Sequence, residues 1–436
     1  MLFKKSIHRL GHVIFWLVIS AAFIGPGTIA SALKAGSTHG LQLMWAVTFS
    51  IVACIVLQES VTRITIASGL TLGEAIQRKF GNNKRVNVNV VLTLSIVFGC
   101  IAYQAGNVTG ALKGVQLVLE VPKYILVLVL FIIAFILMWT GKIKLITTTL
   151  GLLVALMAVL FLFTSVKSEY SMIEVIPSMV KPTIPRESSM LLMALIGTTI
   201  VPYNLFLGSG LSKGKDLNST RFGLIFAIII GGLITVFVLL TGTMLSADFD
   251  FNTIAVTIEN ETGGWGKYIF AIGLFAAGFT SSVTAPLAAA ITVGPITSSL
   301  DGKHGKLIYR LSWISVLLVG SLFSLMRYNP VVIIVMAQAI NGLILPFIAI
   351  SIFYVLNDPE IVPAKFRNSL VSNLILVFIV GSIIFLGLYH LTNIVVNLSG
   401  SQTISNFRFV IAGFLTVAGM IFMIRSVFQP GETPNP

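Results

Sequence analysis

Two helix-breaking sequences interrupt hydrophobic segments that are each long enough to cross a bilayer. The first is Gly25-Pro26-Gly27-Thr28, and the second runs from Thr198 to Asn204 with Pro202 inside it. Proline has no amide donor and clashes with the preceding helical turn, and glycine disfavours helix. Because lipid cannot satisfy the freed backbone groups, such a break persists only where protein or a polar cavity covers it. Matching breaks in two halves of a chain are typical of a secondary transporter with a midplane substrate site, and ordinary proline kinks are the alternative.

The composition places the chain in a lipid bilayer. Of its 436 residues, 56% are hydrophobic and only 10% are charged, and its mean hydropathy is +0.98. Soluble domains carry about 25% charged residues. Apolar runs recur along the whole chain, which predicts an all-α polytopic membrane protein. We expect about twelve transmembrane helices, at 12–34, 41–64, 87–111, 122–140, 145–165, 188–211, 221–245, 266–297, 306–326, 330–355, 368–389 and 406–426.

The distribution of charge predicts the orientation of these helices. With the basic N-terminus in the cytoplasm, the same side receives the Lys and Arg clusters at 78–85, 142–144, 213–221, 303–310 and 365–367. This asymmetry follows the positive-inside rule and favours an even number of spans with both termini cytoplasmic. We expect a multi-pass protein of the plasma (inner) membrane. The net charge of +13 does not indicate a nucleic-acid partner, because most Lys and Arg lie in short loops between spans.

The two breaks also predict an internal repeat. The first broken helix starts inside and the sixth starts outside, so helices 1–5 and helices 6–10 form an inverted 5+5 helix repeat. The expected organisation is a cytoplasmic N-terminus at 1–11, a first repeat at 12–165, an external loop at 166–187, a second repeat at 188–355, peripheral helices 11 and 12 at 356–426, and a C-terminal tail at 427–436.

Several segments resemble the Nramp transporter family. The sequence ALIGTTIVPYNLFL at 194–207 resembles the family's sixth-helix signature, usually written IGATVMPHNLYLH. The segment 270–287 resembles the eighth helix, and Gln338 with Leu345-Pro346-Phe347 resembles the tenth. Gln58, Arg63, Gly69 and Glu74 fit the end of the second helix and the loop after it. The resemblance covers the ten-helix core in order, and it implies the APC/Nramp-type fold of amino-acid and metal-ion symporters with a site between helices 1 and 6.

The chain departs from the family at the positions that bind metal. The family's first-helix motif is DPGN, so Gly25 stands in the place of the metal-binding aspartate and Thr28 in that of the asparagine. In the sixth helix, Val201 replaces the methionine that ligates transition metals, and Tyr203 replaces a histidine.

Two further comparisons with the family concern the third and tenth helices. Gln104 and Asn107 align best with the acids that the family places on its proton route. Of the family's metal-facing groups, only Gln338 and a backbone carbonyl near Thr198 remain.

These replacements change the expected substrate. Valine offers no thioether to select manganese or iron, and glycine and threonine supply no charge to offset a desolvated divalent cation. The half-helices that restart after the breaks carry partial positive charge at their N-termini. We therefore expect a secondary transporter of a small ion or polar solute, with a small anion such as bicarbonate or a carboxylate favoured. The alternatives are a divalent metal cation, magnesium or manganese, in a low-affinity hydrated site, and a non-transporting sensor or scaffold.

The candidate residues fall into two groups. The substrate-binding candidates are Gly25, Gly27, Thr28, Thr198, Thr199, Val201, Tyr203, Asn204 and Gln338. The candidates for coupling to a proton or sodium are Glu59, Gln104, Asn107, Ser281 and Thr284. Each coupling candidate has a structural alternative: Glu59 pairs with Arg63 one turn later on the same helix face, and the others pack helix against helix.

Catalytic and cofactor signals are missing from the sequence. It contains no nucleotide-binding loop, no Ser-His-Asp arrangement and no Cys/His zinc spacing. We predict no enzyme activity, no cofactor and no metal cluster. The only cysteines, Cys54 and Cys100, lie in hydrophobic segments and are expected to be small buried residues without a disulfide.

Overall fold

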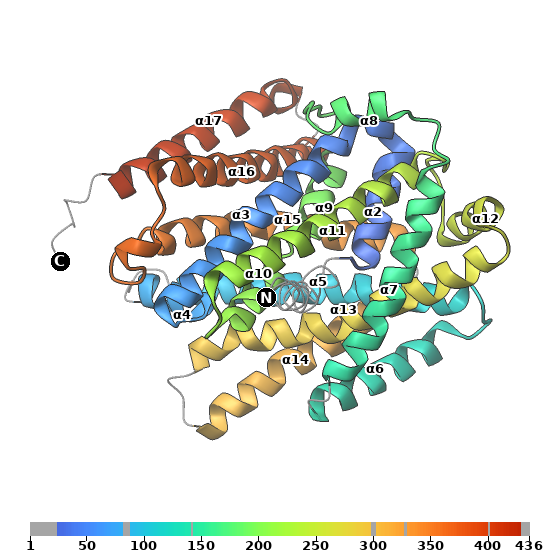
Figure 1. The fold of residues 1–436 in the computed structure, drawn as a ribbon, viewed down its shortest axis with the longest axis horizontal. Coiled ribbons are helices and arrows are strands. Elements are labelled where there is room, and N and C mark those ends of the chain that lie inside the picture. The colour runs from blue at the N-terminus through green and yellow to red at the C-terminus, as the bar shows by residue number, and fades with distance from the viewer. Residues whose placement is uncertain are drawn as a thin grey trace, which may run out of the picture.

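The structure is a computed structural model that describes residues 24–81, 88–140, 143–297, 302–326, 329–399 and 402–428. Every regular element in these ranges is a helix (Figure 1). The long helices overlap the predicted spans, since uninterrupted apolar sequence satisfies its own backbone groups only as helix. They are α3 (Met44–Ser68), α5 (Val88–Gln116), α6 (Lys123–Thr140), α7 (Ile143–Ser165), α11 (Leu217–Gly242), α13 (Trp265–Thr297), α14 (Gly302–Ser324), α15 (Pro330–Leu356), α16 (Leu370–Ser399) and α17 (Gln402–Phe428).

Nine segments of the described residues are long and apolar enough to span a membrane. The expected total of about twelve stays a prediction, because part of the first predicted span, 12–23, lies outside the described residues. Cys54 and Cys100 are buried and free, as the sequence predicts.

The interrupted helices lie at the centre of the bundle. They are α2 (Pro26–His39), which continues into the short helix η1 (Gly40–Leu43), and the pair α9 (Ser189–Thr199) and α10 (Pro202–Ser212). In the most apolar stretch of α9 and α10, 89% of the residues are buried, against 17% for α17. The broken segments are therefore shielded from lipid by other helices, which is the condition under which a break is stable.

The surrounding helices form a shell around this centre. α5 packs against α13, α14 and α15, and α11 packs against α2 and α3. α16 and α17 pack on each other at one edge of the molecule, in the orange to red part of Figure 1. The outward faces of α6 and α17 are mostly apolar and exposed, which suits contact with lipid.

Four short helices occupy loops that the sequence analysis left unassigned. They are α4 (Leu72–Phe80), α8 (Met172–Ser178), α12 (Phe251–Thr262) and η2 (Ala364–Phe366). α3 ends at Gly69, whose φ of +72° is left-handed, and α4 then starts with a capping box between Thr71 and Glu74. An ion pair of 2.6 Å between Lys79 and Asp358 ties α4 to the segment after α15.

Candidate substrate site at the two helix breaks

The second break is confirmed at the predicted place. α9 ends at Thr199, and Ile200 leaves the helical region with φ −98° and ψ 69°. Val201 is extended at φ −70° and ψ 120°, and α10 starts at Pro202. The geometry follows from the proline, which disfavours helix in the residue before it and needs no donor at the first helical position.

At the first break, the described residues begin at Ile24, so the structure shows only the downstream side. Gly25 is extended, with φ −108° and ψ −176°, and Pro26 is the first residue of α2. The hydrogen bond from Ile29 N to Gly25 O, at 3.2 Å, opens the helix. Pro26 fits against α5 because Gly110 faces it: a Cβ atom on Gly110 would collide with the proline ring.

A pair of hydroxyl groups joins α2 and α9. Oγ1 of Thr28 and Oγ1 of Thr198 are 2.8 Å apart, and both residues are fully buried. Thr199 instead donates to Leu195 O within its own helix, at 3.0 Å. At the predicted site between helices 1 and 6, α2 and α9 therefore contact each other. The threonines there have hydrogen-bond partners within the protein.

Gln338 of α15 lies where the two broken helices meet. Its side-chain amide packs on the bare Cα of Gly27, and its backbone carbonyl packs on Gly197 of α9, so a Cβ atom on either glycine would collide with it. The side chain is fully buried, and neither its Oε1 nor its Nε2 has a hydrogen-bond partner in the ranges that the structure describes. A buried amide in this condition is a candidate ligand group, because nearly all buried polar atoms are paired.

A second group of polar side chains faces Gly25. A Cβ atom on Gly25 would lie 3.2 Å from Oγ of Ser281, 3.4 Å from the hydroxyl of Tyr103 and 3.9 Å from Oδ1 of Asn107. All three residues are buried. Tyr103 was not among the predicted site residues. It stands one helical turn before Asn107 on the same face of α5, and this spacing could have identified it.

The residues after the second break line the same region. The ring of Tyr203 packs edge-on against the ring of Tyr103, with centroids 5.1 Å apart and an interplanar angle of 75°. Val201 is buried beside it. Asn204 is also buried, and both atoms of its side-chain amide lack a partner in the protein.

The coupling candidates do not form one cluster. Asn107 and Ser281 lie at Gly25, whereas Gln104 packs on Gly320 of α14. The hydroxyl of Thr284 donates to Ser281 O at 3.3 Å. Gln104 and Asn107 therefore face different neighbours and do not lie together on one surface.

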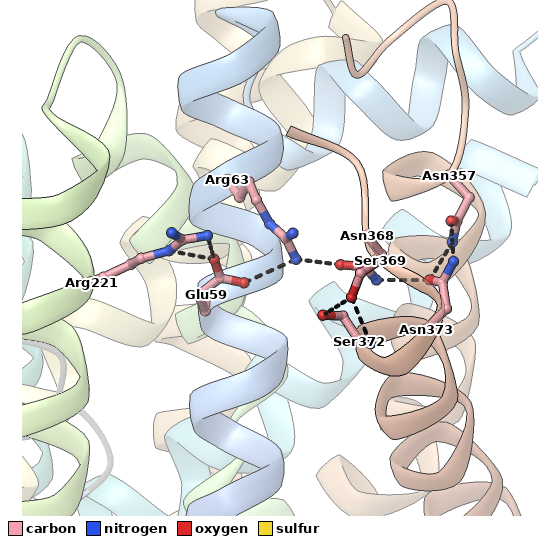
Figure 2. A network of polar contacts seen from close by, with 8 residues as sticks. All are labelled: Glu59, Arg63, Arg221, Asn357, Asn368, Ser369, Ser372 and Asn373. Atoms are coloured by element: carbon pink, nitrogen blue, oxygen red, sulfur yellow. Dashed lines mark hydrogen bonds and ion pairs between the residues drawn. The ribbon is translucent and has the colours of Figure 1, made fainter. Parts of the chain in front are cut away.

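Glu59 belongs to a separate network of polar groups, shown in Figure 2. Its carboxylate lies 3.1 Å from Nη2 of Arg63 and 2.5 Å from Nη2 of Arg221, and it also accepts a hydrogen bond of 2.7 Å from Nε of Arg221. Arg63 continues the network by donating to Oδ1 of Asn368 at 2.6 Å. The intrahelical pair expected from the sequence is present, and Arg221 of α11 joins it.

The side chains that the structure places at the two breaks are uncharged. Among the residues that the structure describes, no three His, Cys, Asp or Glu side chains lie close enough together to hold a metal ion. The helix starts at the two breaks offer fewer backbone hydrogen-bond donors for an anion than the sequence predicted. Pro26 and Pro202 contribute no NH at the starts of their helices, and the NH of Asn204 donates to Val201 O at 3.0 Å.

Comparisons with known proteins agree with this architecture. The rice protein "Metal transporter Nramp3" is 24% identical over 61% of this chain, which spans 53% of that relative's length. The "Divalent metal cation transporter MntH" of Erwinia tasmaniensis is 22% identical over 82% of this chain and 88% of its own. The solved structure of the Eremococcus coleocola manganese transporter superposes with a TM-score of 0.71 at 18% identity, over 98% of this chain and 94% of that one.

The fold class is thereby confirmed as that of a polytopic α-helical transporter. The family described as "Natural resistance-associated macrophage protein-like" matches residues 16–393, which is most of the chain. This protein belongs to the Nramp family of membrane transporters.

Proposed function

We propose that this protein is a secondary transporter that moves a divalent metal cation by alternating access, with the substrate near the junction of α2, α9 and α10. The observation that carries the proposal is the buried contact between Thr28 and Thr198, which brings both helix breaks together beside the unpaired amide of Gln338. Family membership supports transport, and the relatives named above are metal transporters.

The small-anion preference from the sequence is not supported. The matched relatives are named for metals, and the prolines at both helix starts remove backbone donors that an anion needs. The polar groups that remain near the breaks include amide and hydroxyl oxygens, and a cation binds to these. We therefore adopt the divalent cation, which was the alternative reading of the sequence.

The described groups beside the two breaks are uncharged, and this sets the expected affinity and selectivity. A neutral set of oxygen ligands cannot replace the full hydration shell of a divalent ion, because desolvating charge is costly without a counter-charge. Magnesium keeps several waters and accepts hard oxygen ligands, while Val201 offers none of the soft sulfur that favours manganese or iron. We propose a weak, hydrated site that takes magnesium ahead of manganese.

We also propose a plasma (inner) membrane location with both termini in the cytoplasm. The charge asymmetry of the loops supports this orientation. In the structure, basic residues of the predicted cytoplasmic side gather around α4, where Lys79 pairs with Asp358 and Lys213 lies 3.9 Å from Glu74. A proton or sodium is the proposed coupling ion.

Uptake into proteoliposomes tests the function. Purified protein should be reconstituted and supplied separately with magnesium, manganese, bicarbonate and acetate. We expect saturable magnesium uptake, weaker manganese uptake and no anion uptake above empty vesicles. Uptake of bicarbonate or acetate without either cation would overturn the proposal and restore the anion interpretation.

A pair of matched variants links that flux to the site. Gln338→Leu removes the unpaired amide with little change in volume, and we expect magnesium uptake to fall about tenfold, equivalent to about 1.4 kcal/mol. Thr235→Val is the control, because this buried hydroxyl of α11 only donates to Gly231 O in its own helix. Equal uptake by the two variants would contradict a site at Gln338.

A further inference from the structure

Gly25 lies at a point on which polar side chains from two other helices converge. Tyr103 and Asn107 reach it from α5, and Ser281 reaches it from α13, all within 3.9 Å of the position that a Cβ atom on Gly25 would take. The three residues are fully buried. Three side-chain oxygens therefore lie close together around Gly25, whereas Thr28 and Thr198 bond to each other.

The hydroxyl of Ser281 behaves differently from its neighbours on α13. Thr280 donates to Ala276 O at 2.7 Å, and Ser282 donates to Gly278 O at 2.8 Å, as buried hydroxyls in helices usually do. Oγ of Ser281 makes no such bond and has no hydrogen-bond partner among the residues that the structure describes. Its side chain faces Gly25 instead.

Asn107 shows the same contrast on α5. The hydroxyl of Thr109, two residues later, donates to Ala105 O at 2.7 Å. Within the described part of the chain, both Oδ1 and Nδ2 of Asn107 lack hydrogen-bond partners although the residue is fully buried. Leaving such groups unpaired is unfavourable, and each unpaired group in a native structure calls for an ion, a water or a functional role.

We propose that Oδ1 of Asn107, Oγ of Ser281 and the hydroxyl of Tyr103 form a subsite that binds the transported divalent cation beside Gly25. This inference rests on the proposed function, and it moves the ligands from the first and sixth helices to α5 and α13. Gly25 contributes by having no side chain, because any Cβ there would stand among the three oxygens. Neutral hard oxygens suit an ion that keeps part of its hydration shell.

A change of metal preference tests the position of Ser281. A thiolate ligand favours soft metals, so Ser281→Cys should gain cadmium binding by at least about tenfold over the unmodified protein. Ser282→Cys is the matched control, because it changes the neighbouring serine whose hydroxyl already bonds to its own helix. Calorimetry of the purified proteins with cadmium measures the difference. Equal cadmium affinity in the two variants would overturn the assignment of Ser281.

A charge change tests Asn107 by an independent route. Asn107→Asp keeps the shape of the side chain and adds a negative charge, so magnesium and manganese should bind at least about tenfold more tightly. Thr109→Val is the control and should leave both affinities unchanged. An affinity of Asn107→Asp within twofold of the unmodified protein would overturn the subsite.

The two experiments separate this inference from the proposed function. If the unmodified protein takes up magnesium and neither variant changes metal binding, the subsite is wrong and the function stands. If the unmodified protein takes up no divalent cation, the function is wrong. A gain of cadmium binding by Ser281→Cys alone would then still support a cation-accessible cluster at Gly25.

Discussion

The Glu59 network is half-buried and the Gly25 cluster is fully buried. Both are polar groups in an apolar bundle, but they differ in how they are paired. Glu59 is held by two arginines, and the network continues through Asn368 to Asn373 (Figure 2). Around Gly25, Asn107 and Ser281 have no protein partner for their side-chain polar atoms. Polar groups that satisfy one another hold helices together, whereas groups left unpaired in a tightly packed region are available to a ligand.

The largest effect is expected from breaking the paired network. Glu59→Leu removes the carboxylate and leaves Arg63 and Arg221 without their main partner, as removing one member of a buried pair does. Because the side chains remain 17%, 11% and 38% exposed in the order Glu59, Arg63 and Arg221, we expect a loss of about 2 kcal/mol in the free energy of unfolding. Thermal unfolding in detergent measures it.

The control for that experiment is an exposed ion pair. Glu261 lies 3.2 Å from Nζ of Lys167, with 31% and 53% of the two side chains exposed. Glu261→Gln should change stability by less than about 1 kcal/mol. If both variants lose the same amount of stability, Glu59 does not hold the helices together. A role in proton coupling then becomes the better explanation for Glu59.

The next effect concerns the unpaired amide of Gln338. Gly27→Ala places a methyl group where the end of the Gln338 side chain lies, so the amide must move away from the break. We expect magnesium uptake to fall about tenfold while stability changes little. Gly210→Ala on α10 is the control, because nothing lies within 4 Å of its Cβ position. Unchanged uptake in Gly27→Ala would show that magnesium uptake does not depend on the present position of the Gln338 amide.

A smaller effect is expected at Gly25 itself. Gly25→Ala puts a methyl group 3.2 Å from Oγ of Ser281 and 3.4 Å from the hydroxyl of Tyr103, which is tight but tolerable. It should raise the KM for magnesium roughly threefold, equivalent to about 0.7 kcal/mol. Gly106→Ala, with its nearest neighbour at 3.6 Å, is the control on α5. The same KM in Gly25→Ala and Gly106→Ala would contradict the difference between the Gly25 cluster and the Glu59 network.

The smallest effect on transport is expected at the hydroxyl pair of Thr28 and Thr198. Thr28→Val removes the 2.8 Å hydrogen bond to Thr198 while keeping the side-chain shape. A hydrogen bond contributes about 1 kcal/mol to stability, so the melting temperature should fall by a few degrees with little change in KM. A large rise in KM would instead make Thr28 a direct ligand, as the sequence analysis predicted.

The sequence predicted the helices and the breaks because both are local properties. Long apolar runs form helices in lipid, and proline disfavours helix in the residue before it, as at Pro202. Proline alone is not sufficient for a break, because Pro346 lies within α15. The family resemblance placed the first and sixth helices side by side, but the direct contact between Thr28 and Thr198 was not predicted. The packing of Gln338 on Gly27 and the approach of Ser281 to Gly25 did not follow, because they depend on interhelical distances that no local pattern encodes.

The electrostatic interpretation was the weakest part of the sequence analysis. It placed the free amides where the half-helices restart after Thr28 and Tyr203, whereas α2 and α10 begin earlier, at Pro26 and Pro202, which have no NH. It also treated Gln104 and Asn107 as one pair, although Gln104 packs on Gly320 and only Asn107 faces Gly25. Side-chain direction on a helix decides such questions, and α5 presents these two residues to different neighbours.

The position of a bound metal tests the central claim most directly. Crystals of the protein grown with manganese, which replaces magnesium and scatters anomalously, should be measured at the manganese absorption edge. The account predicts one anomalous peak beside Gly25, within coordination distance of Asn107 and Ser281 or joined to them by water. A peak on the Glu59 carboxylate, or at Thr28 and Thr198 with none beside Gly25, would contradict it.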